Sequence, residues 1–596
     1  MKTFIALSMV FAASFWSVPV SAIDSSTGGQ QAQLKQLLAA EWEYELRESP
    51  ELATSIGDHR YNDRWSDSSL AHVQQQKRDL QEWLGKFHAL DSAGLNEQDR
   101  LSLQVMLRNL KERIEGLDLK TYEMPVDQFN GIQLELAQFV AIVPFDSTKH
   151  YEEYLSRLQQ IPRVIDQNID VLQQGKKDGL MPPKFLLEKA VEQCRQIAGT
   201  AGEASAFGQP VAKFPDKVPE ADRKRLHDTI LAAVDHDVRP AYAKLADFLA
   251  KEYAPYGRQN PGVWALPNGD KLYRYSVRQF TTTEMEPEQI HELGLSEVRR
   301  IEGEQLAIAK KLGFSDLKAF RASLKSNPKT FATSPQQIVE KYSSYIDQMR
   351  PQLPKLFGLL PKAPVQVKPM QEYRAKEAAA ADYNPGTPDG SRPGVVWVNT
   401  SDYSHRSLTD IEATAYHEGI PGHHMQISIA QTLPELPPFR QHAFYSAYEE
   451  GWALYAERLG KDIGFYQDPY SDYGRLSGEM LRAIRLVVDT GVHYKHWTRQ
   501  QMVDFFHEHS SDDEPDIQAE TDRYIAWPGQ ALAYKLGQLE ILKLRDQAKS
   551  ELGNNFDIRA FHDEILNGAA LPLDVLDTRV NAWINSQKTS EARGTH

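Results

Sequence analysis

Apolar residues recur at intervals of three and four along most of the chain, which is the spacing that places them on one face of a helix. The pattern repeats several times over residues 30–115. It continues from about residue 401 to residue 587, and the polar residues from Lys588 onward are expected to fray. Patterns bounded by Pro, Gly or polar capping residues predict further helices over residues 151–174, 183–199, 219–252 and 287–312.

The pattern changes over residues 380–400. Residues 382–394 are rich in Asp, Asn, Pro and Gly, which favour turns, and residues 395–400 are largely β-branched or aromatic, which predicts a strand. If this strand lies at an edge, it can pair with the backbone of an extended peptide, and Asn399 near its end is a candidate substrate-binding residue. An ordinary hairpin that only packs against the rest of the protein explains the segment equally well.

The full chain has 596 residues, with 82 acidic against 67 basic side chains and a formal net charge of −15. No block of Lys and Arg interrupts this acidic composition. We therefore expect no nucleic-acid partner and no binding to an anionic membrane surface, because both depend on clustered cations. The length permits a sizeable hydrophobic core.

The N-terminus has the features of a secretory signal peptide. Lys2 provides a positive charge, residues 4–16 are mostly apolar, and small residues precede a cleavage site expected after Ala22. The apolar stretch is shorter than the roughly 20 residues that span a bilayer, so we expect removal rather than anchoring. Cys194 is the single cysteine, which excludes an intramolecular disulfide. We expect a periplasmic or secreted protein that has no membrane association once the signal is removed.

These observations predict a mainly α protein in three parts. Residues 1–22 form the signal peptide, residues 23–280 an N-terminal helical region, and residues 281–596 a C-terminal helical region that carries a metal site. We expect the two helical regions to form one body around a cleft, with a small β element just before the metal-binding helix.

The strongest chemical signal is the segment that begins with His417 and Glu418 and continues to His423 and His424. Imidazoles can hold a divalent metal ion, and a carboxylate beside them can take a proton from an attacking water. The usual zinc motif places two histidines four residues apart on one helical face. Pro421 occupies that position here, so the standard motif is absent.

A regular helix cannot bring these histidines to one ion. At about 100° per residue, His423 falls on the far side of the helix from His417, while His424 returns to the same face about 10.5 Å along the axis. The helix must therefore be interrupted within residues 419–422. The two Gly and one Pro of this segment permit such a break, because Gly has a free φ and Pro lacks an amide hydrogen.

The acidic helix predicted over residues 448–457 is a source for a third ligand. Glu449 and Glu450 point about 100° apart, so one of them can bind the metal while the other forms a hydrogen bond. Glu450 and Glu457 are seven residues apart and share a helical face.

A later helical stretch places Arg485, Asp489 and His493 four residues apart on one face. Asp489 and His493 can form a pair that supports the metal site, or His493 can donate a hydrogen bond to an oxyanion. A buried network that only holds helices together is an equally good interpretation. Arg485 is a candidate substrate-binding residue, and Arg523 can bind a substrate carboxylate through two parallel hydrogen bonds.

Three long motifs make the chain resemble a bacterial family known only as a domain of unknown function. They are HEGxPGHH at residues 417–424, EGWALY at 450–455 and RYxxxPGQALxYxxG at 523–537. The resemblance extends from about residue 38 to residue 585. It implies a large helical zincin-like metallopeptidase fold of the gluzincin kind, distantly related to dipeptidyl peptidase III, thimet oligopeptidase and angiotensin-converting enzyme.

The resemblance also implies roles for individual residues. In the wider group the second histidine ligand follows a Gly, which favours His423 over His424, and the metal-binding carboxylate corresponds to Glu450. Tyr534 is similar to the tyrosine with which related peptidases stabilise the transition state. Tyr534 or His493 would therefore stabilise the oxyanion.

We expect a zinc-dependent hydrolase that cleaves short peptides or peptide-like amides. His417, His423 and Glu450 would hold one zinc ion, with His424 as the alternative to His423, and Glu418 would polarise the attacking water. Cobalt, nickel or manganese would also suit this ligand set.

Two other functions fit the same motifs. One is a non-catalytic periplasmic binding or assembly protein with a structural metal site, and the other is a metal-dependent amidase or esterase that acts on a non-peptide substrate. Glu418 discriminates against the first, because a closed structural site has no use for a carboxylate that does not bind the metal.

Overall fold

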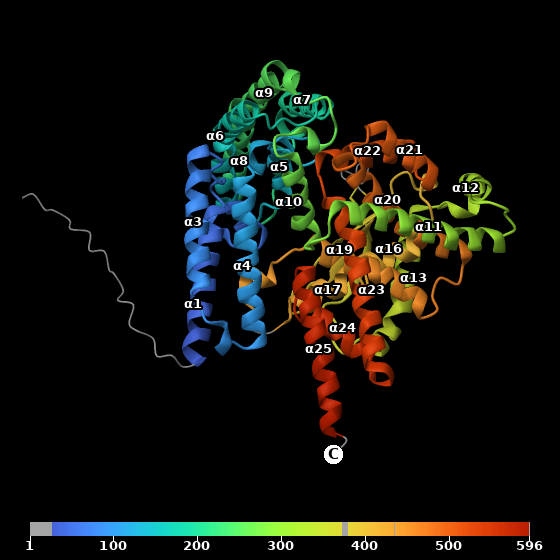
Figure 1. Cartoon of the computed structure of the whole chain (residues 1–596). Coiled ribbons are helices and arrows are strands. Elements are labelled where there is room, and N and C mark those ends of the chain that lie inside the picture. The colour runs from blue at the N-terminus through green and yellow to red at the C-terminus, as the bar shows by residue number, and fades with distance from the viewer. Residues whose placement is uncertain (1–26, 372–378, 434–435, 595–596) are drawn as a thin grey trace, which may run out of the picture.

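The computed structural model of the chain describes residues 27–371, 379–433 and 436–594. Within them nearly all regular elements are helices, and Figure 1 shows the N-terminal helices as a group beside a larger C-terminal body. The expected mainly α fold is therefore confirmed. The signal peptide predicted over residues 1–22 lies outside the described residues.

The N-terminal helices follow the predicted ranges. The helix predicted over residues 151–174 lies within α6 (Thr148–Asp178), and the one predicted over 183–199 is α7 (Lys184–Gly199). The helix predicted over residues 219–252 is divided into α8 (Glu220–Ala233) and α9 (Arg239–Phe248) by a π-helical turn at Val234–Val238. The helices of this part are α1 (Thr27–Glu48), α2 (Pro50–Ser55), α3 (Leu70–His88), α4 (Glu97–Asp118), α5 (Ile132–Gln138), α6 (Thr148–Asp178), α7 (Lys184–Gly199), α8 (Glu220–Ala233), α9 (Arg239–Phe248) and α10 (Gly269–Thr281).

The C-terminal helices differ from expectation at the end of the chain. The residues after Lys588 were expected to fray, but α25 continues to Gly594, because Lys, Glu, Ala and Arg in this stretch all favour helix despite their polarity. The helices of this part are α11 (Pro287–Lys311), α12 (Leu317–Ser326), α13 (Pro335–Met349), α14 (Leu353–Leu356), α16 (Ile411–Glu418), α17 (His423–Ala430), α18 (Pro438–Gln441), α19 (Ser446–Asp462), α20 (Pro469–His493), α21 (Arg499–His509), α22 (Glu514–Ala526), α23 (Ala533–Leu552), α24 (Ile558–Leu566) and α25 (Leu573–Gly594).

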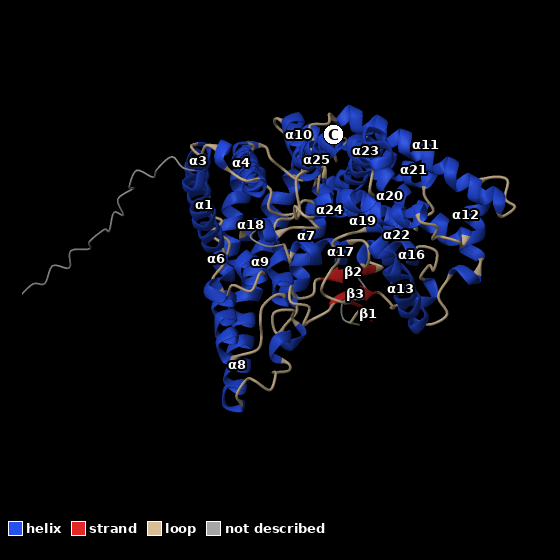
Figure 2. Ribbon diagram, turned by 90° about the horizontal axis from the view of Figure 1, so that it is seen from below, coloured by secondary structure: helices blue, strands red, loops and turns tan. Residues whose placement is uncertain are grey.

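The β element is a three-stranded sheet in the order β1–β3–β2. β1 (Val365–Pro369) pairs in parallel with β3 (Gly394–Val398), and β2 (Ala381–Asn384) pairs antiparallel with the other side of β3. Figure 2 shows the sheet beside α13, α16 and α17. The strand predicted over residues 395–400 is thus central, which corrects the expectation that it lies at an edge. β2, from the segment predicted to be mostly turns, is the edge strand next to α16 and α17.

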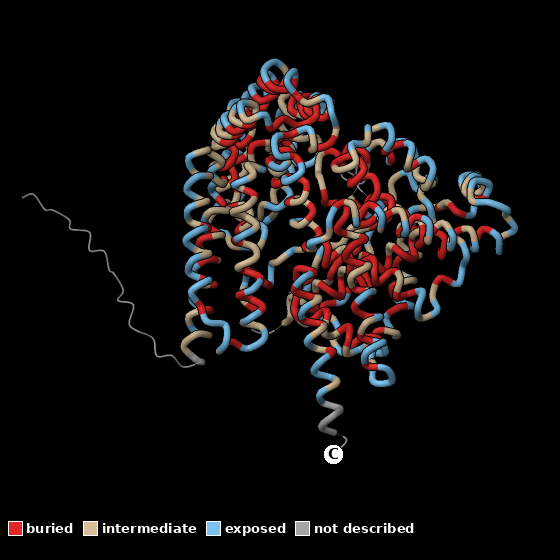
Figure 3. The backbone as a smooth tube through the Cα atoms, viewed as in Figure 1, coloured by how far each residue is buried: buried red, intermediate tan, exposed pale blue. Residues whose placement is uncertain are grey.

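Hydrophobic contacts join the two predicted halves. One cluster of buried side chains lies within residues 65–254, but another packs Leu34 and Leu38 of α1 together with side chains of the C-terminal half. A further cluster combines α10 with Leu486 of α20 and Leu536 of α23. Figure 3 shows buried backbone concentrated in the C-terminal body. The core therefore crosses the boundary expected at residue 280.

The helices α19 and α23 cross closely at Gly451 and Gly537. A Cβ atom on Gly537 would overlap the carbonyl oxygen of Ala447, and one on Gly451 would overlap the Cα atom of Gly537. Such close approach of two backbones requires glycine at both positions. The crossing fixes the turn of α19 that carries Glu450 against the start of α23.

None of the helices in the part of the chain that the structure describes combines the length and the apolar character needed to cross a bilayer.

We predict that Gly537→Ala destabilises the protein by about 1–3 kcal/mol, because the added methyl group must push the two helices apart. The matched control is Gly303→Ala in α11, where a Cβ atom would have no neighbour within 4 Å. The control should be stabilising by about 0.5–1 kcal/mol, because alanine restricts the unfolded chain. Urea unfolding measures both effects, and equal stability changes for the two variants would contradict the close crossing.

Candidate metal centre

The break expected after Glu418 separates α16 from α17. The chain turns within residues 419–422, and the amide of Gly422 donates to the carbonyl of Tyr416 at 2.9 Å. A Cβ atom on Gly422 would overlap the carbonyl oxygen of His417, so the turn requires glycine there. The indole of Trp452 in α19 donates to the carbonyl of Pro421 at 2.9 Å and holds the turn against the next helix.

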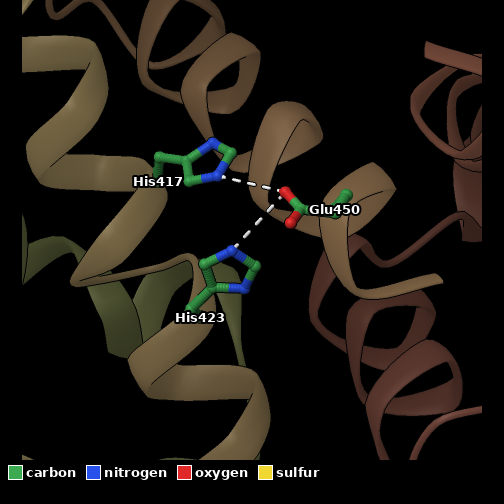
Figure 4. Close-up of side chains that lie close together, drawn as sticks. All are labelled: His417, His423 and Glu450. Carbon is green, nitrogen blue, oxygen red and sulfur yellow. Dashed lines mark ion pairs between the residues drawn. The ribbon is translucent and has the colours of Figure 1, made fainter. Parts of the chain in front are cut away.

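The break brings two histidines to one carboxylate (Figure 4). Oε2 of Glu450 lies 3.4 Å from Nε2 of His417 and 3.7 Å from Nε2 of His423. One ligand atom from each residue lies within 4.8 Å of the other two. Two ligands bound to tetrahedral zinc at about 2.0–2.1 Å are about 3.4 Å apart. These separations suit a shared ion better than direct hydrogen bonds, which measure about 2.7–3.2 Å.

Two atoms of this group lack the hydrogen bonds that buried polar atoms usually have. Oε2 of Glu450 and Nδ1 of His423 are buried and have no hydrogen-bond partner among the residues that the structure describes. An unpaired carboxylate oxygen in the interior is costly unless a cation compensates it. The donor set of two imidazoles and one carboxylate is also the one found in catalytic zinc sites. On both grounds the residues present fit a zinc ion.

Glu457 fixes the orientation of His417. Its Oε1 lies 2.8 Å from Nδ1 of the imidazole, so that Nδ1 carries the proton and Nε2 faces Glu450. The supporting hydrogen bond was expected from Glu449 or Glu450, but it comes from Glu457, two turns after Glu450 on α19. Its signal in the sequence is the spacing of seven residues from Glu450, which places both carboxylates on one face.

The pKa values of His417 and Glu450 show that positive charge stabilises this buried group. Burial alone would lower the pKa of His417, but the neighbouring Glu450 and Glu457 carboxylates raise it to about 10. Burial would raise the pKa of Glu450, and the two imidazoles instead hold it well below its usual range. Burial and the charge of Glu450 raise the pKa of Glu449 to about 8, so Glu449 is neutral beside it. A proton on His417 thus supplies the positive charge that a metal ion would supply, and binding of such an ion would release the proton.

His424 has other partners. Its Nε2 donates to the carbonyl of Ala363 at 3.0 Å, and its Nδ1 accepts from the hydroxyl of Tyr383 in β2 at 2.9 Å. Burial lowers its pKa to about 4, so the ring is neutral. With both ring nitrogens engaged, His424 joins α17 to the sheet, and the geometry favours His423 as the second ligand.

Glu418, the last residue of α16, is placed beside the ligands without belonging to the group that could hold the ion. Burial raises the pKa of its carboxyl, although the nearby His417 and His423 act to lower it. A cavity of about 420 Å³ is lined by His417, Glu418 and Glu457 and by Arg482 of α20. Glu418 and one of the candidate ligands, His417, therefore open onto the same space.

His493 does not have the role expected of it. Its Nδ1 accepts from the amide of Val263 at 3.1 Å, and its Nε2 donates to the carbonyl of Tyr524 at 2.9 Å. Burial lowers its pKa to about 3. Both nitrogens are committed to backbone groups, so no donor is left for an oxyanion. Its expected partner Asp489 instead accepts from Tyr273 and from a backbone amide, and the two residues serve to hold helices together.

Asn399 is also structural. It is 1% exposed, and its side chain donates to the carbonyl of Ala379 and accepts from the amide and hydroxyl of Ser401. These contacts close the end of β3, which is why the expected substrate contact is wrong.

The remaining predicted residues gather around Tyr534. The guanidinium carbon of Arg485 lies 4.6 Å from the centre of the Tyr534 ring, and Arg523 donates to the Tyr534 hydroxyl at 3.4 Å. Arg482 also faces this ring, at 5.9 Å. The sequence reasoning missed Arg482, although it lies one turn before Arg485 on the same helix.

Comparison with known proteins gives a family and a fold. A family model described as "Bacterial protein of unknown function (DUF885)" matches residues 50–580. "The putative lipoprotein from Colwellia psychrerythraea" has a crystal structure that matches with a TM-score of 0.88 and 29% identity, over 94% of this chain and 100% of that one. A "putative lipoprotein of unknown function from Shewanella oneidensis" matches with a TM-score of 0.70 and 18% identity, over 93% and 99%. No protein with a curated description matches.

We predict that His423→Ala and His424→Ala separate the two candidate ligands. His423→Ala should lose bound zinc, because it removes one of the ligand atoms grouped around Glu450. His424→Ala should keep about one zinc per chain but unfold at a lower temperature, because it removes two buried hydrogen bonds. Elemental analysis after zinc reconstitution measures the first effect, and retention of zinc by His423→Ala would contradict the assignment.

We predict a graded loss of zinc affinity at Glu457. Glu457→Gln keeps an oxygen that can accept from His417 but loses the charge, and Glu457→Leu loses both. The affinity should fall by about 10–100-fold in the leucine variant and less in the glutamine variant. Competition with a chromogenic chelator measures it. Equal affinity in all three proteins would show that Glu457 does not support the metal site.

Proposed function

We propose that this chain, which belongs to the bacterial family of unknown function DUF885, is a zinc-dependent hydrolase that cleaves short peptides. The observation that carries the proposal is the grouping of His417, His423 and Glu450 beside a carboxylate, Glu418, that is free to act as a base. A metal site with only a structural role needs closed coordination and has no use for that fourth group.

A zinc ion held by the three ligands would act as a Lewis acid that lowers the pKa of a water molecule and polarises the scissile carbonyl. Glu418 takes the proton as the water oxygen adds to the carbonyl carbon. The C–N bond then breaks, and Glu418 passes the proton to the leaving amine. Glu457 keeps His417 in the tautomer and orientation that this arrangement needs.

Tyr534 is our candidate for stabilising the oxyanion. It lies in the first turn of α23, just before the crossing at Gly537 that fixes this helix against the turn of α19 carrying Glu450. The guanidinium of Arg523 donates to its hydroxyl oxygen, and the guanidinium of Arg485 lies over its ring. Both positive charges stabilise negative charge on the phenol oxygen, which makes the hydroxyl a stronger hydrogen-bond donor to an oxyanion.

The edge strand supports a peptide substrate in particular. β2 pairs with β3 on one side and contacts α16 and α17. Asp382 of β2 is close enough to Glu418 for its charge to raise the pKa of that carboxyl. An extended substrate added to the outer edge of β2 would therefore run past the catalytic group, with its backbone held by main-chain hydrogen bonds. An amidase or esterase with a small substrate would not use such an edge.

The cellular location is part of the proposal. Both structural neighbours carry the description "putative lipoprotein", and the N-terminal residues of this chain have the pattern of a secretory signal. We infer that the peptides to be cleaved are found in the cell envelope or outside the cell.

We predict that Glu418→Gln retains about one zinc per chain but hydrolyses peptides about 10²–10⁴-fold more slowly, because the base is lost while the ligands remain. Glu340→Gln on the exposed face of α13 is the matched control and should hydrolyse at the wild-type rate. A mass-spectrometric assay with a mixed library of short peptides measures the rates. Undiminished cleavage by Glu418→Gln would overturn its assignment as the base.

A further inference from the structure

Three arginines surround Tyr534 at the boundary between α20, α22 and α23. Arg482 and Arg485 are one turn apart on α20, with their guanidinium carbons 5.9 and 4.6 Å from the centre of the Tyr534 ring. Arg523, near the end of α22, donates to the Tyr534 hydroxyl at 3.4 Å. We call Arg482, Arg485, Arg523 and Tyr534 the arginine cluster.

The positive charge of the cluster exceeds the negative charge that pairs with it. Arg485 and Arg523 share one carboxylate, Glu520, at 2.9 and 3.3 Å. Arg482 donates to a backbone carbonyl, that of Gly478 at 3.2 Å, and forms no ion pair within the described part of the chain. Glu520 can therefore neutralise one of the three charges.

Each arginine of the cluster also has an unused donor. Nε of Arg482, Nη1 of Arg485 and Nε of Arg523 are buried and lack a hydrogen-bond partner among the described residues. Arg485 is only 5% exposed. Unpaired arginine nitrogens also occur elsewhere, in Arg157 and in the neighbouring Arg440 and Arg579, but three of them do not surround one side chain there. Three unpaired donors around one side chain call for an anionic acceptor.

The cluster is connected to the candidate metal centre. Arg482 lines the 420 Å³ cavity that also contacts His417 and Glu418. One turn earlier on α20, a Cβ atom on Gly478 would lie 3.8 Å from Oε2 of Glu457 and 3.4 Å from Arg482. The same turn of α20 therefore lies beside Glu457, which orients the candidate ligand His417, and beside Arg482, the first arginine of the cluster.

We propose that the arginine cluster binds the free α-carboxylate at the C-terminal end of the substrate peptide. Guanidinium groups match a carboxylate through paired hydrogen bonds, and a short peptide carries such a group in every case. The inference rests on the proposed peptidase function and narrows it to an enzyme that cleaves near the C-terminal end of its substrate.

The rest of the cavity favours a carboxylate over a more highly charged anion. Its walls include four further carboxyl groups, and these would repel a dianion such as phosphate more strongly than the single charge of a peptide terminus. They also suit the ammonium group at the other end of a short peptide. These groups are Asp410, Asp512, Asp513 and Asp516.

The first test compares four forms of one tetrapeptide as substrates of the zinc-loaded full chain: the free acid, its C-terminal amide, and the N-acetylated form of each. We expect kcat/KM to be about ten-fold or more lower for the amides than for the acids, because the amides lose a charge-assisted contact with the guanidinium groups. Equal cleavage of acid and amide would overturn the inference while leaving the peptidase proposal intact.

Variants of Arg482 test whether the preference for the free acid over the amide arises at the arginine cluster. Arg482 is half-buried and outside the Glu520 pairs, so Arg482→Gln should fold, cleave the acid more slowly and lose most of the preference for acid over amide. Arg482→Lys keeps the charge but not the planar fork and should be intermediate. Arg195→Gln, on the exposed surface of α7, should behave as wild type. An unchanged preference in Arg482→Gln, with native circular dichroism, would contradict the site.

A binding measurement separates this inference from the proposed function. Calorimetric titration of Glu418→Gln with the free-acid tetrapeptide should show binding about ten-fold or more tighter than with the amide, and tighter than with inorganic phosphate. If the free-acid tetrapeptide binds tightly but the wild type does not hydrolyse it, the carboxylate site is supported and the proposed hydrolase function is contradicted. Stronger binding of phosphate than of the peptide acid would overturn the carboxylate assignment.

Discussion

The break between α16 and α17 is the constraint on which the rest of the structure depends. Two histidines six residues apart cannot meet on a regular helix, so the backbone must turn within residues 419–422. Gly422 permits the turn, and Trp452 holds it from α19. α19 supplies Glu450 as well, and α23 fixes α19 through the crossing of Gly451 and Gly537. One local irregularity therefore determines how four helices must pack around the site.

The charges buried by this packing are not balanced within the chain. Burying Glu450 and Glu457 against His417 leaves the group stable only when it holds positive charge, supplied by a proton or by a metal ion. A group that existed only for stability would be better replaced by apolar side chains of similar size. The arginine cluster has the opposite imbalance, because its three positive charges are paired with the single negative charge of Glu520. His417 of the first site and Arg482 of the second line one cavity, and each site would be satisfied by an opposite charge from outside the chain.

Much of this arrangement could be predicted from the sequence because it is local. Helical periodicity predicts the helices, and the spacing of His417, Pro421 and His423 requires a break. Contacts between distant segments could not be predicted. The backbone groups of Val263 and Tyr524 engage His493, and the segment before β3 contributes the edge strand. Family resemblance supplied the choice of His423, for which the structure gives a physical reason in the partners of His424.

Zinc K-edge X-ray absorption of the full chain, loaded with one equivalent of zinc, would show whether His417, His423 and Glu450 hold one ion. We predict a four-coordinate spectrum with two imidazole nitrogens at about 2.0–2.1 Å and oxygen ligands at about 2.0–2.2 Å. Because His423→Ala should lose the bound ion, zinc added to that variant should show no imidazole scattering. A spectrum with oxygen ligands alone, or one unchanged by removal of His423, would contradict the claim.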